Sequence, residues 1–463
     1  MANPTLQNPT VDLFLYDLQD GLGESSVEID QRRRQLWQGI LNEKSIENRL
    51  REIKEREKST SNYIELLPER LLPFDPPYDG YYYPVKLGDT LSILVDCSGK
   101  PNESNWEKLS FEEQLQDIKT GVLEHTDNKI TGEMGRSWLI WGQLHDSEQS
   151  LKDTAIYLYE NLNLFPSQNW VRDYKGKGYF EGATLFEIES PDLDSDGINQ
   201  TKHALICLFP FEILQDKRSE IIGKLYRHLI RIFCYRNKIL WVYEQSFQLK
   251  TKLKADTEEV QQLVDSLPSR MLESTIDLNR LQKDLASALK LSQSYETKLG
   301  YLKEKAIAIK VNIDNYIAWL DKLEKLDPEC DLIFFRRFEK LTREKYLVQI
   351  DTDHEILTAG LKPLGNYAKT VTGIIEIERS KNERTLNMTV ALASAGLGAA
   401  SLTASTFNDQ AKQLVAVWMP PPQGQTDPPI VSYWISTALA LFVSVSVGLL
   451  AAWITWFFLR KRR

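Results

Sequence analysis

The side chains with the clearest chemical pattern lie near the C-terminus, on one face of a predicted helix over residues 385–408. This segment contains no charged residue. Small and polar residues recur in it at steps of three and four, which places them on one side of a helix. Such a face suits either the wall of a water-filled pore or close packing between helices, and the sequence leaves both open. The pore-lining candidates are Asn387, Ala391, Ser394, Gly398, Ser401, Ser405 and Asn408, with Asp409 as a candidate at the pore mouth.

A second group of ion-binding candidates lies in the stretch DLDSDG, which resembles the beginning of a calcium-binding EF-hand loop. Its carboxylates are Asp192, Asp194 and Asp196. The twelfth position of the loop is His203, where an EF-hand has a bidentate Glu, and strands rather than helices are predicted on either side. A polar hairpin loop explains this stretch better than a metal site does.

Other chemistry has little support in the sequence. The four cysteines and five histidines are scattered, without the spacing of a zinc site or a disulfide framework. Gly-rich phosphate loops, nucleophile elbows and metalloprotease patterns are absent from the sequence. We therefore predict no catalytic residues and no enzyme activity.

The charge of the chain also restricts its partners. A formal net charge of -9 without a basic patch before the C-terminal tail argues against nucleic acid. The first residues lack the basic and apolar regions of a secretory signal, so the N-terminus is expected in the cytoplasm.

Two uncharged stretches, 385–408 and 430–459, are each long enough to cross a bilayer as a helix. The loop between them, 409–429, contains one basic residue, whereas the tail 460–463 is entirely basic. The positive-inside rule then places both termini in the cytoplasm. These features predict a two-helix transmembrane hairpin in an integral membrane protein of the inner or plasma membrane, with the lipid bilayer as a partner.

Residues 1–210 mix strand-like and helical patterns, as in LSILVDCSG, HALICLF and DTAIYLYENLNLF, and predict a cytoplasmic α+β domain. Residues 211–384 predict long helices that form a coiled-coil and stalk region, with a helix from about 211 to 267, another over 269–326, and a break near Pro363. An apolar stripe, broken only by Ser292, runs along the second helix. Its members are Leu278, Leu281, Leu285, Ala288, Ser292, Tyr295, Leu299, Leu302, Ala306, Ile309, Ile313, Tyr316, Leu320 and Leu323.

This order of parts resembles the CorA-type magnesium transporter family. The stretches IIEIERSKNERTLNMTVALASAG (374–396) and FFLRKRR (457–463) look like that family's approach to its first membrane helix and its basic tail. The resemblance implies a homo-oligomer, a pentamer in that family, with a divalent cation such as Mg²⁺ as transported or regulatory ion. The family's Gly-Met-Asn signature is missing, and Thr406, Phe407 and Asn408 stand at the equivalent place.

Two functions follow as hypotheses. The first is an oligomeric CorA-like cation channel or transporter that is gated by its cytoplasmic domain. The alternative is a membrane-tethered interaction or effector protein, in which the hairpin serves as anchor and assembly element.

Overall fold

A computed structural model describes residues 4–18, 26–40, 46–59, 61–126, 132–193, 199–271 and 277–381. The chain divides into two compact units, and each is described by itself. The first contains Met1–Leu253 and Lys298–Leu357, and the second contains Lys254–Thr297 and Thr358–Arg463.

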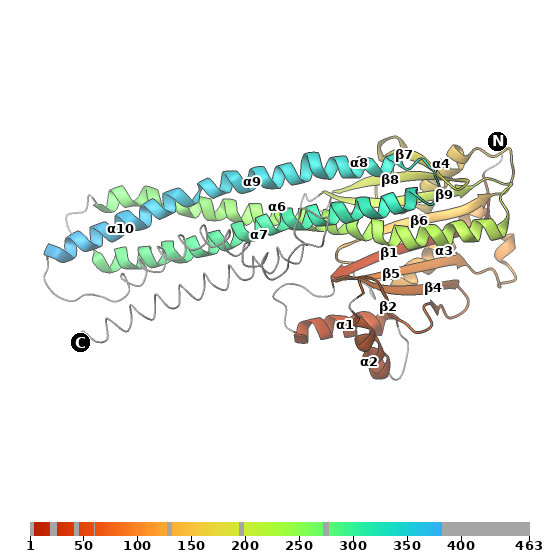
Figure 1. Cartoon of the computed structure of the whole chain (residues 1–463), viewed down its shortest axis with the longest axis horizontal. Coiled ribbons are helices and arrows are strands. Elements are labelled where there is room, and N and C mark those ends of the chain that lie inside the picture. Colours follow the sequence, from red (N-terminus) through yellow and green to blue (C-terminus); the bar gives the residue numbers. More distant parts are fainter. Residues whose placement is uncertain are drawn as a thin grey trace, which may run out of the picture. The chain divides into compact units, whose positions relative to one another are not determined.

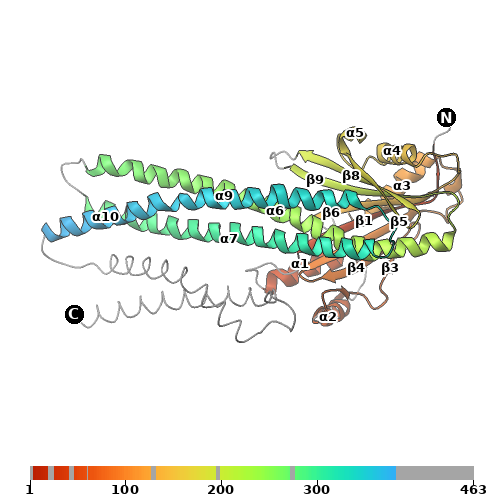
Figure 2. The ribbon, with the colours of Figure 1, turned by 45° about the horizontal axis from the view of Figure 1, so that its top comes forward.

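The strands described in the first unit form one nine-stranded sheet. They are β1 (Leu6–Leu18), β2 (Ile64–Glu65), β3 (Leu72–Pro73), β4 (Asp79–Leu87), β5 (Thr90–Gly99), β6 (Gly135–Leu144), β7 (Tyr174–Phe180), β8 (Ala183–Leu193) and β9 (Asn199–Phe209). Their order is β2-β4-β5-β1-β6-β9-β8-β7, with β3 paired to β4, and β4 and β8 lie toward opposite sides of the sheet (Figure 2). The pair β6–β9 is parallel, whereas β1–β5 and β8–β9 are antiparallel.

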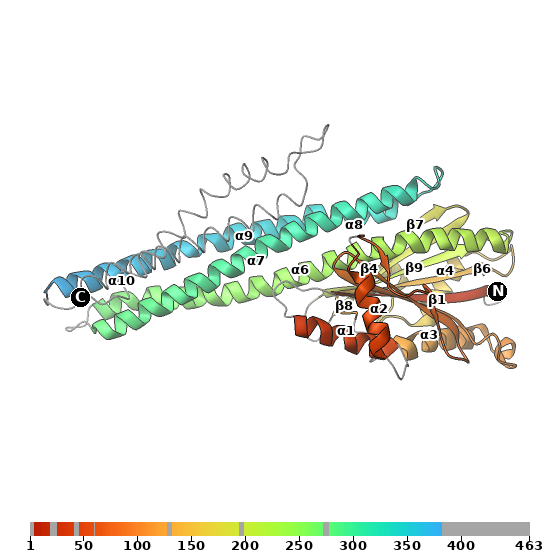
Figure 3. The same ribbon diagram turned by 60° about the horizontal axis from the view of Figure 1, so that its bottom comes forward.

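Helices cover both faces of this sheet (Figure 3). On one face α3 (Phe111–Thr126) and α4 (Leu151–Leu162) enclose the main apolar core, which α1 (Ser26–Ile40) and α2 (Ile46–Glu57) extend. On the other face lies the first part of α6 (Gln215–Met271), where Phe233 packs edge to face against Phe14 of β1. The short helix α5 (Trp170–Asp173) precedes β7. Because both faces are covered, the central strands are buried on both sides.

The remaining helices follow α6 along the chain (Figure 1). They are α7 (Leu278–Glu324), α8 (Ile333–Leu341), a π-helical turn (Thr342–Leu347), α9 (Val348–Ala359) and α10 (Leu361–Lys381). In the second unit, segments of α6, α7 and α10 pack through a separate apolar core that includes Val260, Leu285 and Val371.

Several predictions for the helical region are confirmed. Most of the apolar stripe on α7 is buried, including Leu299, Leu302 and Ile313. The predicted break appears at Gly360, between α9 and α10, and Pro363 lies in the first turn of α10, where a missing N–H is tolerated. The predicted end of α6 is wrong, because this helix continues through Pro268 to Met271.

The predicted fold class is wrong in its last part, the two-helix transmembrane hairpin. Within the described ranges, which end at Lys381, no helix is both long enough and apolar enough to span a membrane. The physical reason is that the long helices α6, α7 and α10 carry charged residues along their length. The predicted spans 385–408 and 430–459, the loop 409–429 and the tail 460–463 lie outside the described residues. The fold is therefore an α+β sheet domain with long helices.

Candidate functional site

The candidate site is a buried polar layer between the sheet and α6, within the first unit. Side chains alternate along β1, as the pleat requires. Leu13 and Leu15 point into the core on the α3 side, whereas Asp12 and Tyr16 point toward α6. The hydroxyl of Tyr16 donates a hydrogen bond of 2.9 Å to the carbonyl oxygen of Ile230 on α6.

Two aspartates face each other in this layer. Asp12 on β1 and Asp96 on β5 are direct cross-strand partners, and both are buried. The hydroxyl of Tyr226, from α6, lies 2.7 Å from Oδ2 of Asp12 and 3.2 Å from Oδ2 of Asp96. That hydroxyl also accepts a hydrogen bond of 2.9 Å from Nε1 of Trp141 on β6. Three strands and one helix therefore meet at the aspartate pair, which is the name used below for Asp12 and Asp96.

The protonation of the aspartate pair follows from its surroundings. Burial, and then the charge of Asp96, raises the pKa of Asp12 well above its usual value. Burial also raises the pKa of Asp96 to about 6. Two neighbouring buried carboxylates ionise together only at a large electrostatic penalty, so we expect the pair to keep one proton at neutral pH.

A second cluster lies farther along the same layer and joins β8 to two helices. Arg236 of α6 donates a hydrogen bond of 2.6 Å from Nη2 to Oε1 of Glu189, and Arg337 of α8 donates to the other oxygen. Burial opposes ionisation of Glu189, but the two guanidinium groups outweigh it and lower its pKa. Glu189 is therefore a charged anchor for α6 and α8.

Glu187 lies two residues earlier on β8, and its pKa is shifted in the opposite direction. It is fully buried, and neither of its carboxyl oxygens has a hydrogen-bond partner. Burial, and then the charge of Glu189, raises its pKa to about 8. We therefore expect Glu187 to be mostly protonated at neutral pH, unlike its neighbour.

His203 of β9 lies beside Glu187 in this cluster. Its Nδ1 is 3.1 Å from the hydroxyl of Ser137, and its Nε2 is 3.6 Å from Oε1 of Glu187, which is too long for a hydrogen bond. Burial, and then the positive charges of Arg236 and Arg337, lowers the pKa of His203 well below its usual value. The imidazole is thus neutral and structural.

The chemistry available to this layer is proton storage and the holding of helices. Asp12, Glu187 and His203 are all closed off from solvent. No group of three or more His, Cys, Asp or Glu side chains that could hold a metal ion occurs in the part of the chain that the structure describes. All four cysteines are free thiols.

The residues predicted from the sequence lie elsewhere. The pore-lining candidates from Asn387 to Asn408, and Asp409 at the pore mouth, are outside the described residues. Asp192 lies on β8 opposite Gln200 of β9, and Asp194 and Asp196 fall in the undescribed stretch between these two strands. The antiparallel pairing of β8 with β9 agrees with the polar hairpin rather than with an EF-hand.

Sequence reasoning did not find the aspartate pair or the Glu187–Glu189 cluster. A signal was present, because each acid interrupts an apolar strand: Asp12 in VDLFLYD, Asp96 in SILVDCS and Glu187 in TLFEIES. A charged residue inside a strand that is buried on both faces needs a partner.

Comparison with protein-family models, with curated proteins and with solved structures finds no match for this chain. The resemblance to CorA-type transporters therefore stays a prediction from the sequence.

Proposed function

We propose that the chain is an oligomeric, CorA-like cation channel or transporter that acts at a membrane and is regulated by its α+β domain. One observation carries this proposal, namely the order of the parts. A sheet domain is followed by long helices, and the last described helix, α10, ends at Lys381, four residues before the uncharged stretch 385–408. The membrane location and the homo-oligomer, a pentamer by the family resemblance, belong to the same proposal.

The buried polar layer supports a regulatory role for the α+β domain. Helix α6 is held to the sheet by groups whose charge depends on protonation, through Tyr226 at the aspartate pair and through Arg236 at Glu189. A change of charge at these groups alters how strongly α6 binds the sheet. Regulation of a channel requires an element of this kind, with more than one energetic state.

The second candidate function is a membrane-bound interaction or effector protein. It is favoured by apolar side chains that lie exposed on α8 and α9, such as Ile333 at 72% and Ile356 at 65% exposure. Apolar side chains on a helix surface are common at protein-protein contacts, although single ones also occur on ordinary surfaces.

The two functions are separated by measuring cation flux and oligomer size in the same reconstituted preparation. Ser401→Leu places a bulky apolar group on the predicted pore face, so a channel should lose flux and keep its oligomer size. Thr403→Leu is the matched control, because the helical spacing predicts residue 403 off that face. Loss of the oligomer in Ser401→Leu, or equal flux in both variants, would favour helix packing and the interaction protein.

A further inference from the structure

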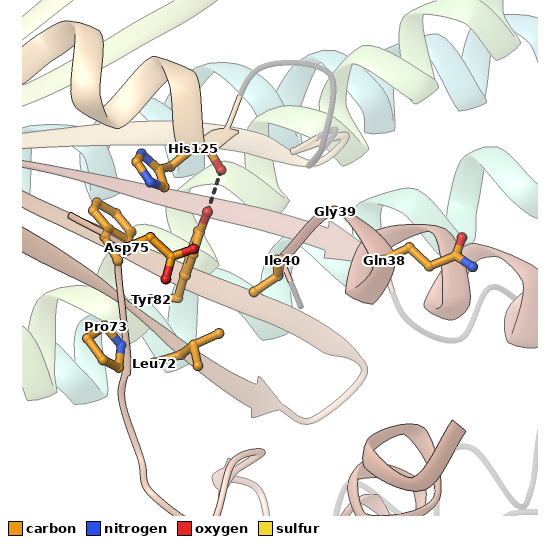
Figure 4. Close-up of a pocket in the computed structure, with 9 residues that line it drawn as sticks. Gln38, Gly39, Ile40, Leu72, Pro73, Asp75, Tyr82 and His125 are labelled. Atoms are coloured by element: carbon orange, nitrogen blue, oxygen red, sulfur yellow. Dashed lines mark hydrogen bonds between the residues drawn. The ribbon is translucent and has the colours of Figure 1, made fainter. Parts of the chain in front are cut away.

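A pocket of about 470 Å³ lies beside the sheet, and Figure 4 shows the residues that line it. Its walls come from the end of α1, from β3 and the two residues after it, from β4 and from the end of α3. This volume is within the range of small-molecule sites, which is about 300–1,000 Å³. The pocket lies within the first unit and is separate from the buried polar layer.

The walls of the pocket combine apolar and polar surface in about equal parts. Ile40 and Leu72 supply aliphatic surface, and Phe74 and Tyr82 supply aromatic rings 5.0 Å apart in an edge-to-face arrangement. The ring of Phe74 stacks on His125 with 3.7 Å between centroids. An apolar part of a ligand can therefore lie against these side chains.

The polar edge of the pocket includes two hydrogen-bond acceptors, on Tyr82 and Asp75. The hydroxyl of Tyr82 donates its hydrogen to the carbonyl oxygen of His125 at 3.0 Å, so only its acceptor capacity remains for a ligand. Asp75 adds an exposed carboxylate beside Tyr82, whereas the side chain of Gln38 points away (Figure 4). Burial, and then the charge of Asp75, raises the pKa of Tyr82, so its hydroxyl is neutral.

Charge decides which ligands fit. No Lys or Arg is among the residues that line the pocket, which disfavours phosphates, nucleotides and other anions. Across the described ranges of the chain, no cationic side chain pairs with Asp75. A carboxylate without a counter-charge at the edge of a pocket attracts a cation through its charge.

We propose that this pocket binds a small organic cation that has a flat apolar body and an amine or amidine group. The cationic group meets Asp75 and the hydroxyl oxygen of Tyr82, and the apolar body lies against Ile40, Leu72 and the rings. This proposal does not depend on ion conduction. A failed binding test would therefore leave the proposed function untouched, and a failed flux test would leave this proposal untouched.

Binding of benzamidine to the full chain, measured by calorimetry or ligand-observed NMR, tests this site. Benzamide is the neutral probe of the same shape. We expect a Kd on the order of 1 mM for benzamidine, as for other ligands of this size. Benzamide should bind at least about tenfold more weakly, because the charge-assisted contact with Asp75 is lost.

Variants complete the test. Asp75→Asn should weaken benzamidine binding about tenfold or more, and this exposed substitution should leave the melting temperature unchanged. Glu124→Gln, which removes a nearby exposed carboxylate that does not line the pocket, is the matched control and should bind as the wild type does. No benzamidine binding up to about 10 mM would overturn the site. Equal affinity for the two probes, or no effect of Asp75→Asn, would overturn it as well.

Discussion

Asp12 and Asp96 face each other across the antiparallel strands β1 and β5, and the hydroxyl of Tyr226 contacts both carboxyl groups from α6. The strand register places both acids on the same face of the sheet, directly opposite one another. The hydroxyl of Tyr226 therefore joins α6 to both acids at once.

The stability of the chain should fall as pH rises through the titration of the aspartate pair. An unfolded Asp has a pKa near 3.9, whereas the folded pKa of Asp96 is about 6. Between these values the unfolded chain releases its proton while the folded chain retains it, so unfolding becomes easier as pH rises. The more strongly raised pKa of Asp12 extends this loss to higher pH.

Asp12→Asn tests the shared proton, because the amide imitates a neutral carboxyl group. The quantity to compare is the free energy of unfolding of the variant minus that of the wild type. This difference should be larger at pH 8 than at pH 5, by on the order of 1–3 kcal/mol. Urea unfolding at several pH values measures this difference. Glu160→Gln, an exposed change on α4, is the control. An Asp12→Asn difference that does not vary with pH would show that the pair shares no proton.

Tyr226→Phe removes the hydroxyl that joins α6 to the aspartate pair. It should lower the free energy of unfolding by about 1–3 kcal/mol, because the carboxyl groups and Nε1 of Trp141 lose a buried partner. Tyr301→Phe, at a tyrosine with 50% exposure, should change stability by less than about 0.5 kcal/mol. Similar effects in the two variants would contradict the bridging role of Tyr226.

Glu189→Gln should be among the most destabilising changes of a single side chain in the sheet domain. It leaves the buried guanidinium of Arg236 without its carboxylate, and breaking a buried ion pair typically costs about 3–5 kcal/mol. Arg337→Gln should cost about 1 kcal/mol or less, since the side chain of Arg337 is partly exposed. Thermal melting of the two variants compares them, and equal losses would show that Arg236 does not depend on Glu189.

Leu302→Asp should destabilise the α7 helix and its surroundings by several kcal/mol, because Leu302 is buried and an unpaired carboxylate there has no partner. Tyr301→Asp, one residue earlier on the exposed side of the same helix, should have little effect. Circular dichroism melts of both variants measure the contrast. Unchanged melting of Leu302→Asp would mean that the stripe is solvated.

Periodicity in the sequence predicted much of the fold. The strand patterns in LSILVDCSG and HALICLF correspond to β5 and β9, and the α7 stripe is buried as its spacing indicates. The strand order was not predictable, because the neighbours of β1 are β5 and β6, which lie far along the chain. The aspartate pair depends on that order: Asp12 and Asp96 are 84 positions apart in sequence (96 − 12), and only the β1–β5 register brings them together.

Cation flux into vesicles that contain the purified wild-type chain is the most direct test of the proposed function. With a gradient of Mg²⁺ or another cation, the account predicts uptake above that of protein-free vesicles, by an oligomer whose size is measured in the same sample. Uptake equal to that of protein-free vesicles, for every cation and gradient tested and with an intact oligomer, would contradict the channel or transporter.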